Sequence, residues 1–256
     1  MSWDRNIIIK SEQEIAIMRE AGRITARVLS LMGEMVRPGI TTGELDAAAE
    51  ETIRKHGALP SFKGYPGPYP YPASICTSIN DELVHGIPGK RKLKEGDIIS
   101  IDCGSTFEGY VGDAAITLGV GEISPAAQRL LEVTQEALRV GIQKMLPGNH
   151  VGDVSAAIQQ YVEGEGYSVT REYTGHGVGR NMHEGPQVPN YGTQGRGPVL
   201  RSGMTIALEP MVLAGTPRTQ VLEDKWVVAS ADGALTAHFE HTVAVMDGNP
   251  MILTLP

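Results

Sequence analysis

Residues 96–118, GDIISIDCGSTFEGYVGDAAITL, contain two aspartates, Asp102 and Asp113, each in a run typical of a β-strand. In residues 98–103 and 113–118 the side chains alternate between an apolar face and a second face, which predicts strands that bury one side. Each aspartate lies on the second face, beside small residues. A carboxylate cannot be placed there without a cation or hydrogen-bond donors. This stretch therefore predicts a functional site.

The composition is that of an ordinary soluble protein of 256 residues, long enough for one large domain or two small ones. The net charge is −8 and the chain has no cluster of Lys and Arg, which argues against nucleic acid or acidic membranes as partners. Cys76 and Cys103 fit a reducing compartment without disulfides. Residues Ser2–Lys10 do not resemble a signal peptide, and no apolar run approaches the roughly 20 residues that span a bilayer. We therefore expect a cytoplasmic protein.

Helical spacing and capping signals predict four helices, at residues 11–35, 41–57, 125–145 and 152–165. A short strand is predicted at residues 74–79. Residues 60–72 are rich in Gly, Pro and Tyr, which excludes a regular helix or strand. This segment is either a plain surface loop or a wall over a site, because aromatic side chains cost little entropy to place.

The two halves of the chain repeat each other in the same order. Pro38-Gly39 lies 109 residues before Pro147-Gly148, and further matches follow at that offset. Residues 203–209 (GMTIALE) match residues 96–102 (GDIISID) at an offset of 107, and EHTVAV at 240–245 matches DAAITL at 113–118. A duplication is the better interpretation. It predicts a single catalytic domain, residues 1–256, with halves at about 11–120 and 121–250.

A pseudo-twofold axis between these halves would bring four acids to one face of a shared sheet: Asp102, Asp113, Glu209 and Glu240. Three histidines would surround them: His85, His176 and His183. Unneutralised carboxylates at such a place would raise one another's pKa values sharply. The four acids and His176 are enough ligands for two divalent ions, and oxygen ligands with one imidazole favour Mn²⁺, Fe²⁺, Co²⁺ or Zn²⁺. Such a pair can lower the pKa of a shared water and polarise a carbonyl, which predicts hydrolysis.

Other motifs carry less weight. The chain has no HExxH, no GxxxxGK[ST] and no GxSxG, and residues 175–180 lack the last glycine of a dinucleotide loop. Cys103 faces the apolar side of its strand and is expected in the core. His238 and His241 flank Glu240 and are expected to support the site. Any one of the acids alone would be read as a surface residue or a cap.

These acids and histidines lie, in order, in the sequence segments SINDELVHGIP, GDIISID, GYVGD, TGHGVGRNMHEGPQVPNY, GMTIALEPM and FEHTV. From Ile15 to about Val245 the chain resembles the type I methionine aminopeptidases. The resemblance implies the pita-bread α/β fold, in which two pseudo-symmetric halves form an antiparallel sheet with helices outside. It also implies removal of the N-terminal methionine when the second residue is small.

The resemblance assigns roles to individual residues. The implied ligands of two metal ions are Asp102, Asp113, His176, Glu209 and Glu240. A metal-bridged hydroxide would attack the scissile carbonyl, Glu209 would carry the proton and His183 would hydrogen-bond the carbonyl oxygen. His85 would contact the scissile amide. The implied pocket for the methionine side chain consists of Tyr71, Cys76, Met182 and Trp226. Partners would be nascent-protein or peptide N-termini, met at the ribosome, and the enzyme would be a monomer.

Two alternatives remain open at this point. A Xaa-Pro dipeptidase or aminopeptidase of the same fold would usually carry a large extra N-terminal domain, whereas about ten residues precede the first predicted helix. A metal-free member kept as a binding module would be expected to lose ligands, whereas this chain keeps all five.

Overall fold

The computed structural model describes residues 7–256, so that the beginning of the Ser2–Lys10 segment lies outside the described residues. The helices are α1 (Glu12–Met35), α2 (Thr42–Lys55), α3 (Pro125–Ile142) and α4 (Val151–Gly164). The strands are β1 (Leu59–Pro60), β2 (Ile75–Ile79), β3 (Glu82–Val84), β4 (Ile98–Phe107), β5 (Tyr110–Gly119), β6 (Ser168–Val169), β7 (Thr174–Gly177), β8 (Glu184–Pro189), β9 (Thr205–Leu208), β10 (Met211–Leu213), β11 (Thr219–Val221), β12 (Val228–Ser230), β13 (Thr236–His238), β14 (Glu240–Ala244) and β15 (Met251–Ile252). None of these helices is both long and apolar enough to cross a bilayer.

The predicted helices are confirmed, and local signals explain where they begin. Ser11 with Glu14, and Thr41 with Glu44, form reciprocal capping boxes at the starts of α1 and α2. The Ser124 hydroxyl caps α3, whose first residue is a proline.

Helix α3 ends three residues earlier than predicted. Its last turn tightens, because the Lys144 N–H donates to the Gly141 carbonyl and the Met145 N–H to the Ile142 carbonyl, each at 3.0 Å. These bonds reach back three residues instead of four, so residues 143–145 leave the α-helix.

The two predicted strands at residues 98–103 and 113–118 are parts of one longer hairpin, β4–β5. They extend to a two-residue turn at Glu108 and Gly109, whose φ angles are 47° and 78°. Positive φ at both central residues is what the tightest hairpin turns require. Because this turn fixes the register, Asp102 pairs with Ala115.

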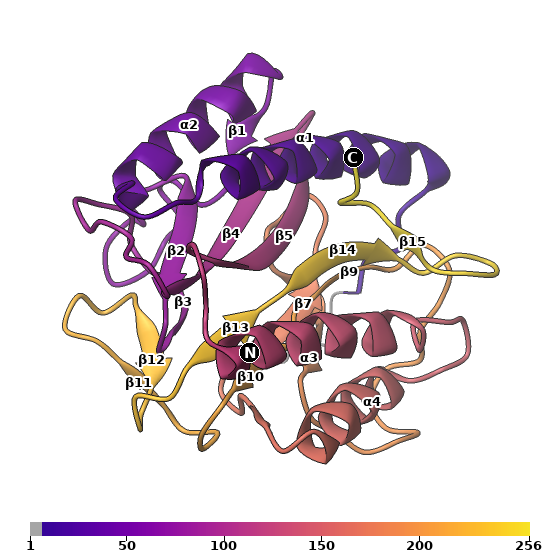
Figure 1. Cartoon of the computed structure of the whole chain (residues 1–256). Helices are drawn as coiled ribbons and strands as arrows, with labels where there is room; N and C mark the ends of the chain where they lie inside the picture. Colours follow the sequence, from indigo (N-terminus) through magenta and orange to yellow (C-terminus); the bar gives the residue numbers. More distant parts are fainter. Residues whose placement is uncertain (1–6) are drawn as a thin grey trace.

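Within residues 7–256 the main sheet has nine strands and is antiparallel, as predicted, with the central order β4-β5-β14-β9. The first two strands come from the first half of the chain and the other two from the second half. Strands β5 and β14 pair directly at the seam between the halves, as Figure 1 shows. The four acids thus lie on, or directly after, four adjacent strands.

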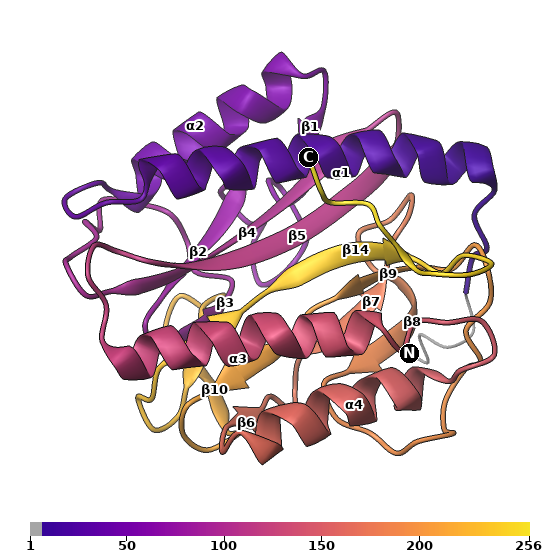
Figure 2. The ribbon, with the colours of Figure 1, turned by 45° about the vertical axis from the view of Figure 1, so that its right-hand side comes forward.

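Each half has its own pair of helices, which lie on the outside of the sheet in Figure 2: α1 and α2 over the first half, α3 and α4 beside the second. The alternation in β4 is confirmed, because Ile99, Ile101 and Cys103 are fully buried in the core under α1 and α2. In the second half, Ile206 and Leu208 of β9 belong to the core beneath α3 and α4. Burying each of these large aliphatic side chains stabilises the fold by about 1.5–3 kcal/mol.

Helix α1 crosses β5 at a contact between two glycines. A Cβ on Gly112 would lie 2.4 Å from the backbone nitrogen of Gly22, so that the substitution Gly112→Ala must push the helix away from the sheet. We expect this to lower the free energy of unfolding by about 1–3 kcal/mol, as overpacking does. Equilibrium denaturation in urea measures the change.

The matched control is Gly33→Ala in the same helix, where an added Cβ meets nothing within 4 Å. This variant should become more stable, by up to about 1 kcal/mol. A Gly112→Ala midpoint at or above that of the unsubstituted chain would contradict the close contact.

Candidate metal and peptide site

The predicted site residues converge in one pocket of about 160 Å³. Because one buried water needs about 10–15 Å³ of such space, the pocket has room for a ligand group. Its lining contains every residue implied as a metal ligand, catalytic group or part of the methionine pocket, and it adds the aromatic side chains of Phe62 and Tyr65. The full lining is Phe62, Tyr65, Tyr71, Cys76, His85, Asp102, Asp113, His176, Met182, His183, Glu209, Trp226 and Glu240. The structure therefore brings together both the implied metal ligands and the implied methionine pocket.

Strand register places the acids beside one another. Ala115 pairs with Asp102 on one side and with Glu240 on the other, so that the two acids flank a methyl group across three strands. Asp113 lies two residues from Ala115 and therefore projects from the same face. The small side chain between the acids leaves the space above it open.

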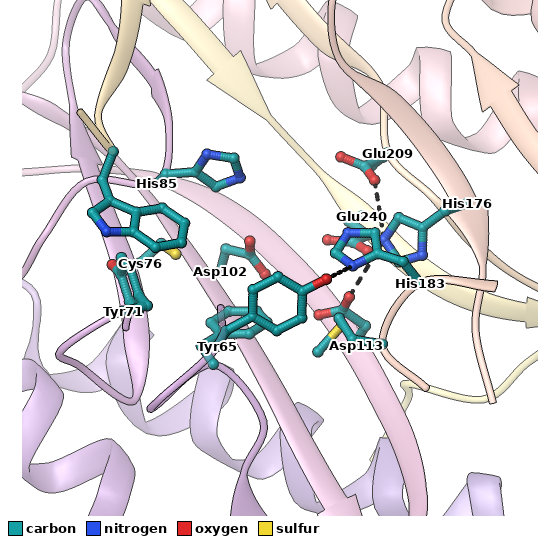
Figure 3. A pocket seen from close by; sticks show the side chains of 13 residues that line it. Tyr65, Tyr71, Cys76, His85, Asp102, Asp113, His176, His183, Glu209 and Glu240 are labelled. Carbon is teal, nitrogen blue, oxygen red and sulfur yellow. Dashed lines mark hydrogen bonds and ion pairs between the residues drawn. The ribbon is translucent and has the colours of Figure 1, made fainter. Parts of the chain in front are cut away.

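Three of the five implied ligands form the tightest group. One ligand atom from each of Asp113, His176 and Glu240 lies within 4.8 Å of the others. Glu209, which directly follows β9, is close as well, because its Oε1 is 3.5 Å from the His176 Nε2. Asp102 is not part of the tightest group but lines the same pocket, as Figure 3 shows.

A backbone contact sets the tautomer of His176. Its Nδ1 is 2.9 Å from the carbonyl oxygen of Gly177, which can only accept, so that Nδ1 carries the hydrogen and Nε2 presents a lone pair. Burial lowers the pKa of His176 to about 3, helped by the neighbouring His183, and the ring is neutral near pH 7. Its contacts with Asp113 and Glu209 are therefore not ion pairs. A neutral ring in this orientation is ready to bind a metal.

The acids are held where their charge is poorly compensated. Burial raises the pKa of Asp113 to about 7, and burial together with the neighbouring carboxylates raises the pKa values of Asp102, Glu209 and Glu240. Within residues 7–256, one buried carboxylate oxygen on each of Asp102, Asp113 and Glu240 has no hydrogen-bond partner. The described pocket lining includes no Lys or Arg. Divalent cations would supply the missing partners, so these residues fit a metal centre.

The opposite end of the pocket is aromatic. Strand β3 pairs with β12, which brings His85, just after β3, close to Trp226, just before β12. The Trp226 ring packs edge-on against Tyr71, with centroids 5.1 Å apart, and against His85 at 6.2 Å. The Tyr71 hydroxyl donates to the Gly86 carbonyl at 2.8 Å, which fixes the ring.

Residues 61–72 form a wall of the pocket and contain no helix or strand, although Leu59–Pro60 pairs with β4 as the short strand β1. The segment lies so close to Trp226 that a Cβ on Gly67 would be 2.4 Å from the indole ring. Of the two interpretations left open by the sequence, the structure therefore favours the wall.

The two cysteines are free, buried thiols, as expected. Cys103 is in the core, and Cys76 lines the pocket. Burial raises the pKa of the Cys76 thiol well above its usual range, so that this side chain is a packing group and not a nucleophile.

The sequence did not single out two further residues, Phe62 and Tyr65. The Tyr65 hydroxyl is 2.6 Å from Nδ1 of His183, and Phe62 joins it in the lining. The aromatic composition of residues 60–72 was the available signal. His238, which was expected to support the site, lies beside the acids, with its Nε2 3.7 Å from Glu209 and 3.8 Å from Glu240, but this nitrogen makes no hydrogen bond to either. His241 points elsewhere and contacts Thr254 at 2.8 Å, because neighbouring residues in a strand face opposite sides.

Comparisons with known proteins show the family of this chain. The chain matches the family model of metallopeptidase family M24 over residues 16–247. It is 53% identical to the methionine aminopeptidase of Clostridium perfringens over 249 residues, which are 97% of this chain and 99% of that protein. It is also 53% identical to methionine aminopeptidase 1 of Bacillus subtilis over 248 residues, again 97% and 99% of the two chains.

Solved structures show the same relation. The crystal structure of methionine aminopeptidase from Thermotoga maritima has a TM-score of 0.95 at 45% identity and covers 98% of this chain and 100% of that one. A Xaa-Pro dipeptidase from Bacillus anthracis, at 24% identity and a TM-score of 0.78, shares the fold over 96% of this chain and 61% of its own. This chain belongs to metallopeptidase family M24, among the methionine aminopeptidases.

Proposed function

We propose that this protein removes the N-terminal methionine from peptides and nascent proteins whose second residue is small. The observation that carries the proposal is the joining of two unlike surfaces in one pocket. Its lining combines unpartnered carboxylates and a neutral imidazole with aromatic rings, a thiol and the Met182 side chain. The first suits metal ions, and the second suits a long, polarisable side chain.

The proposed metal centre holds two divalent ions of the Mn²⁺, Fe²⁺, Co²⁺ or Zn²⁺ type. Its ligands are Asp102, Asp113, His176, Glu209 and Glu240. When bound, the ions would supply Lewis acidity and a water of lowered pKa.

The remaining chemistry falls to side chains of this chain. Glu209, whose pKa is raised by burial and by the neighbouring Asp102 and Asp113, carries the proton to the leaving amine. Desolvation lowers the pKa of His183, so that the neutral ring can donate one hydrogen bond to the scissile carbonyl oxygen as charge develops there. His85 binds the scissile amide from the Trp226 side. Tyr71, Cys76, Met182 and Trp226 hold the methionine side chain and exclude water.

We also propose a physiological setting. The substrates are N-termini of nascent proteins met at the ribosome in the cytoplasm, and the enzyme acts as a monomer. One chain supplies every residue of the described pocket, so that no second copy is needed to complete it.

Methionine release tests the function directly. We expect release of methionine from Met-Ala-Ser, at least a hundredfold loss after chelation, and recovery when Mn²⁺, Fe²⁺, Co²⁺ or Zn²⁺ is returned one at a time. Release is followed by chromatography of the free amino acid. A preference for an Ala-Pro peptide would identify a Xaa-Pro peptidase instead, and a stable protein that takes up no metal would identify a binding module.

Metal binding should depend on pH, because the acids must lose protons first. The pKa of Asp113 is about 7 and those of Asp102, Glu209 and Glu240 are raised, so that the site holds more protons at about pH 6 than at about pH 8. Affinity should therefore rise with pH over this interval, and more protons should be released at the lower pH. Calorimetry in two buffers of different ionisation enthalpy counts these protons. An affinity that is unchanged over this interval would be inconsistent with protonated acids.

His183→Ala should lower kcat by about 10²–10³-fold, the usual effect of removing one donor to a developing oxyanion, and should change KM much less. The control is His150→Ala, at the start of α4 and outside the pocket. Steady-state kinetics on Met-Ala-Ser separates the two constants. An effect on KM alone would contradict the assigned role.

A further inference from the structure

A buried ion pair involves Glu184, the residue directly after His183, and is not part of the pocket lining. Lys10 Nζ is 2.5 Å from Glu184 Oε2, and only 3% and 2% of the two side chains are exposed. A buried pair is weak evidence for a contribution to stability, because desolvation offsets the attraction between the charges. Its position within the fold is more informative.

Glu184 closes the turn that carries His183. Its Oε1 accepts a hydrogen bond from the N–H of Asn181 at 3.1 Å, so that one carboxylate spans residues 181–184. The backbone of Glu184 also pairs with Gly177 of β7, directly after the ligand His176. The Glu184 carboxylate therefore helps to set where the His183 side chain leaves the backbone.

Lys10 holds that carboxylate from the N-terminal segment. Its own N–H donates to the Gly203 carbonyl at 2.8 Å, and its Nζ also donates to the Ile8 carbonyl at 3.2 Å. Nearby, Ile7 forms a bridge with Gly185. Contacts other than the one to Glu184 thus hold both the backbone and the amine of Lys10 in place.

The side chains of the pair pack tightly against the backbone at Gly179. A Cβ on Gly179 would lie 2.5 Å from Lys10 Cε and 2.7 Å from Glu184 Oε1. The pair therefore fills the space that a side chain at residue 179, just before the turn, would otherwise take.

We propose that Lys10 is a positioning residue, which acts through Glu184 to hold residues 181–184 and so to aim His183 at the scissile carbonyl. This inference rests on the proposed function, because it assigns Lys10 a role in the same reaction. It makes the segment before α1 part of the catalytic apparatus. A purely structural pair would affect folding and nothing specific to His183.

A double-mutant cycle separates the two possibilities. In the otherwise unsubstituted enzyme, loaded with metal, Lys10→Met should lower kcat on Met-Ala-Ser at least tenfold and change KM less than twofold. In the His183→Ala background the same substitution should change kcat less than twofold, because nothing remains to be aimed. An equal loss in both backgrounds, or an unchanged kcat in the first, overturns the proposal.

A loss of protein stability must be distinguished from a loss of the correct position of the His183 side chain. In Lys10→Met/Glu184→Gln neither member of the pair carries a charge, so the Tm of this double variant should recover relative to Lys10→Met while kcat stays at least fivefold low. Val162→Ala, in the buried face of α4, is the control for general destabilisation and should keep kcat. If kcat recovers together with Tm, the pair is structural and the proposal fails.

A spectroscopic measurement on the metal-free protein gives an answer independent of turnover. Long-range ¹H–¹⁵N spectra of the histidine rings should show shifted His183 signals in Lys10→Met, whereas the His150 signals stay in place. Unshifted His183 signals would overturn the proposal. If the unsubstituted protein releases no methionine at all, the proposed function fails first; an active enzyme that is insensitive to Lys10→Met refutes only the role of Lys10.

Discussion

The structure depends on one electrostatic constraint: several carboxylates lie on one face of a sheet without enough donors to satisfy them. Asp113 and Glu240 are almost completely buried, and each has an oxygen with no partner in the described part of the chain. Buried carboxylates of this kind either keep a proton or bind a cation. The small Ala115 leaves space for cations between two acids, and the lone pair of His176 is available to bind one.

The pseudo-twofold arrangement explains how a modest chain can assemble such a group. Strands β5 and β14 meet at the seam, and each half contributes two adjacent strands that bear one acid each. Neither half could place all four acids alone. The repulsion between the clustered carboxylates is offset by two separate hydrophobic cores, one beneath each pair of helices.

The fold alone does not choose the reaction, because the same architecture occurs in a Xaa-Pro dipeptidase at 24% identity. The choice lies in the walls around the acids. Here residues 61–72 and Trp226 enclose an aromatic recess, and Tyr65 reaches His183 from the same segment. The ion pair of Lys10 and Glu184 contacts the turn at residues 181–184, which carries His183, through a separate set of residues.

The sequence by itself determined the helices, the alternation of β4 and the order of acids and histidines in two halves, because caps and strand periodicity are local and a duplication preserves order. The match to a known family then supplied the roles of those residues. Only the tertiary structure decided which three ligands come closest, that residues 61–72 wall the pocket, and that Phe62 and Tyr65 join the site. It alone brought Lys10 to Glu184, 174 residues away. Such contacts depend on strand register and on the path of loops, which are settled by packing between distant segments and leave no periodic trace in the chain.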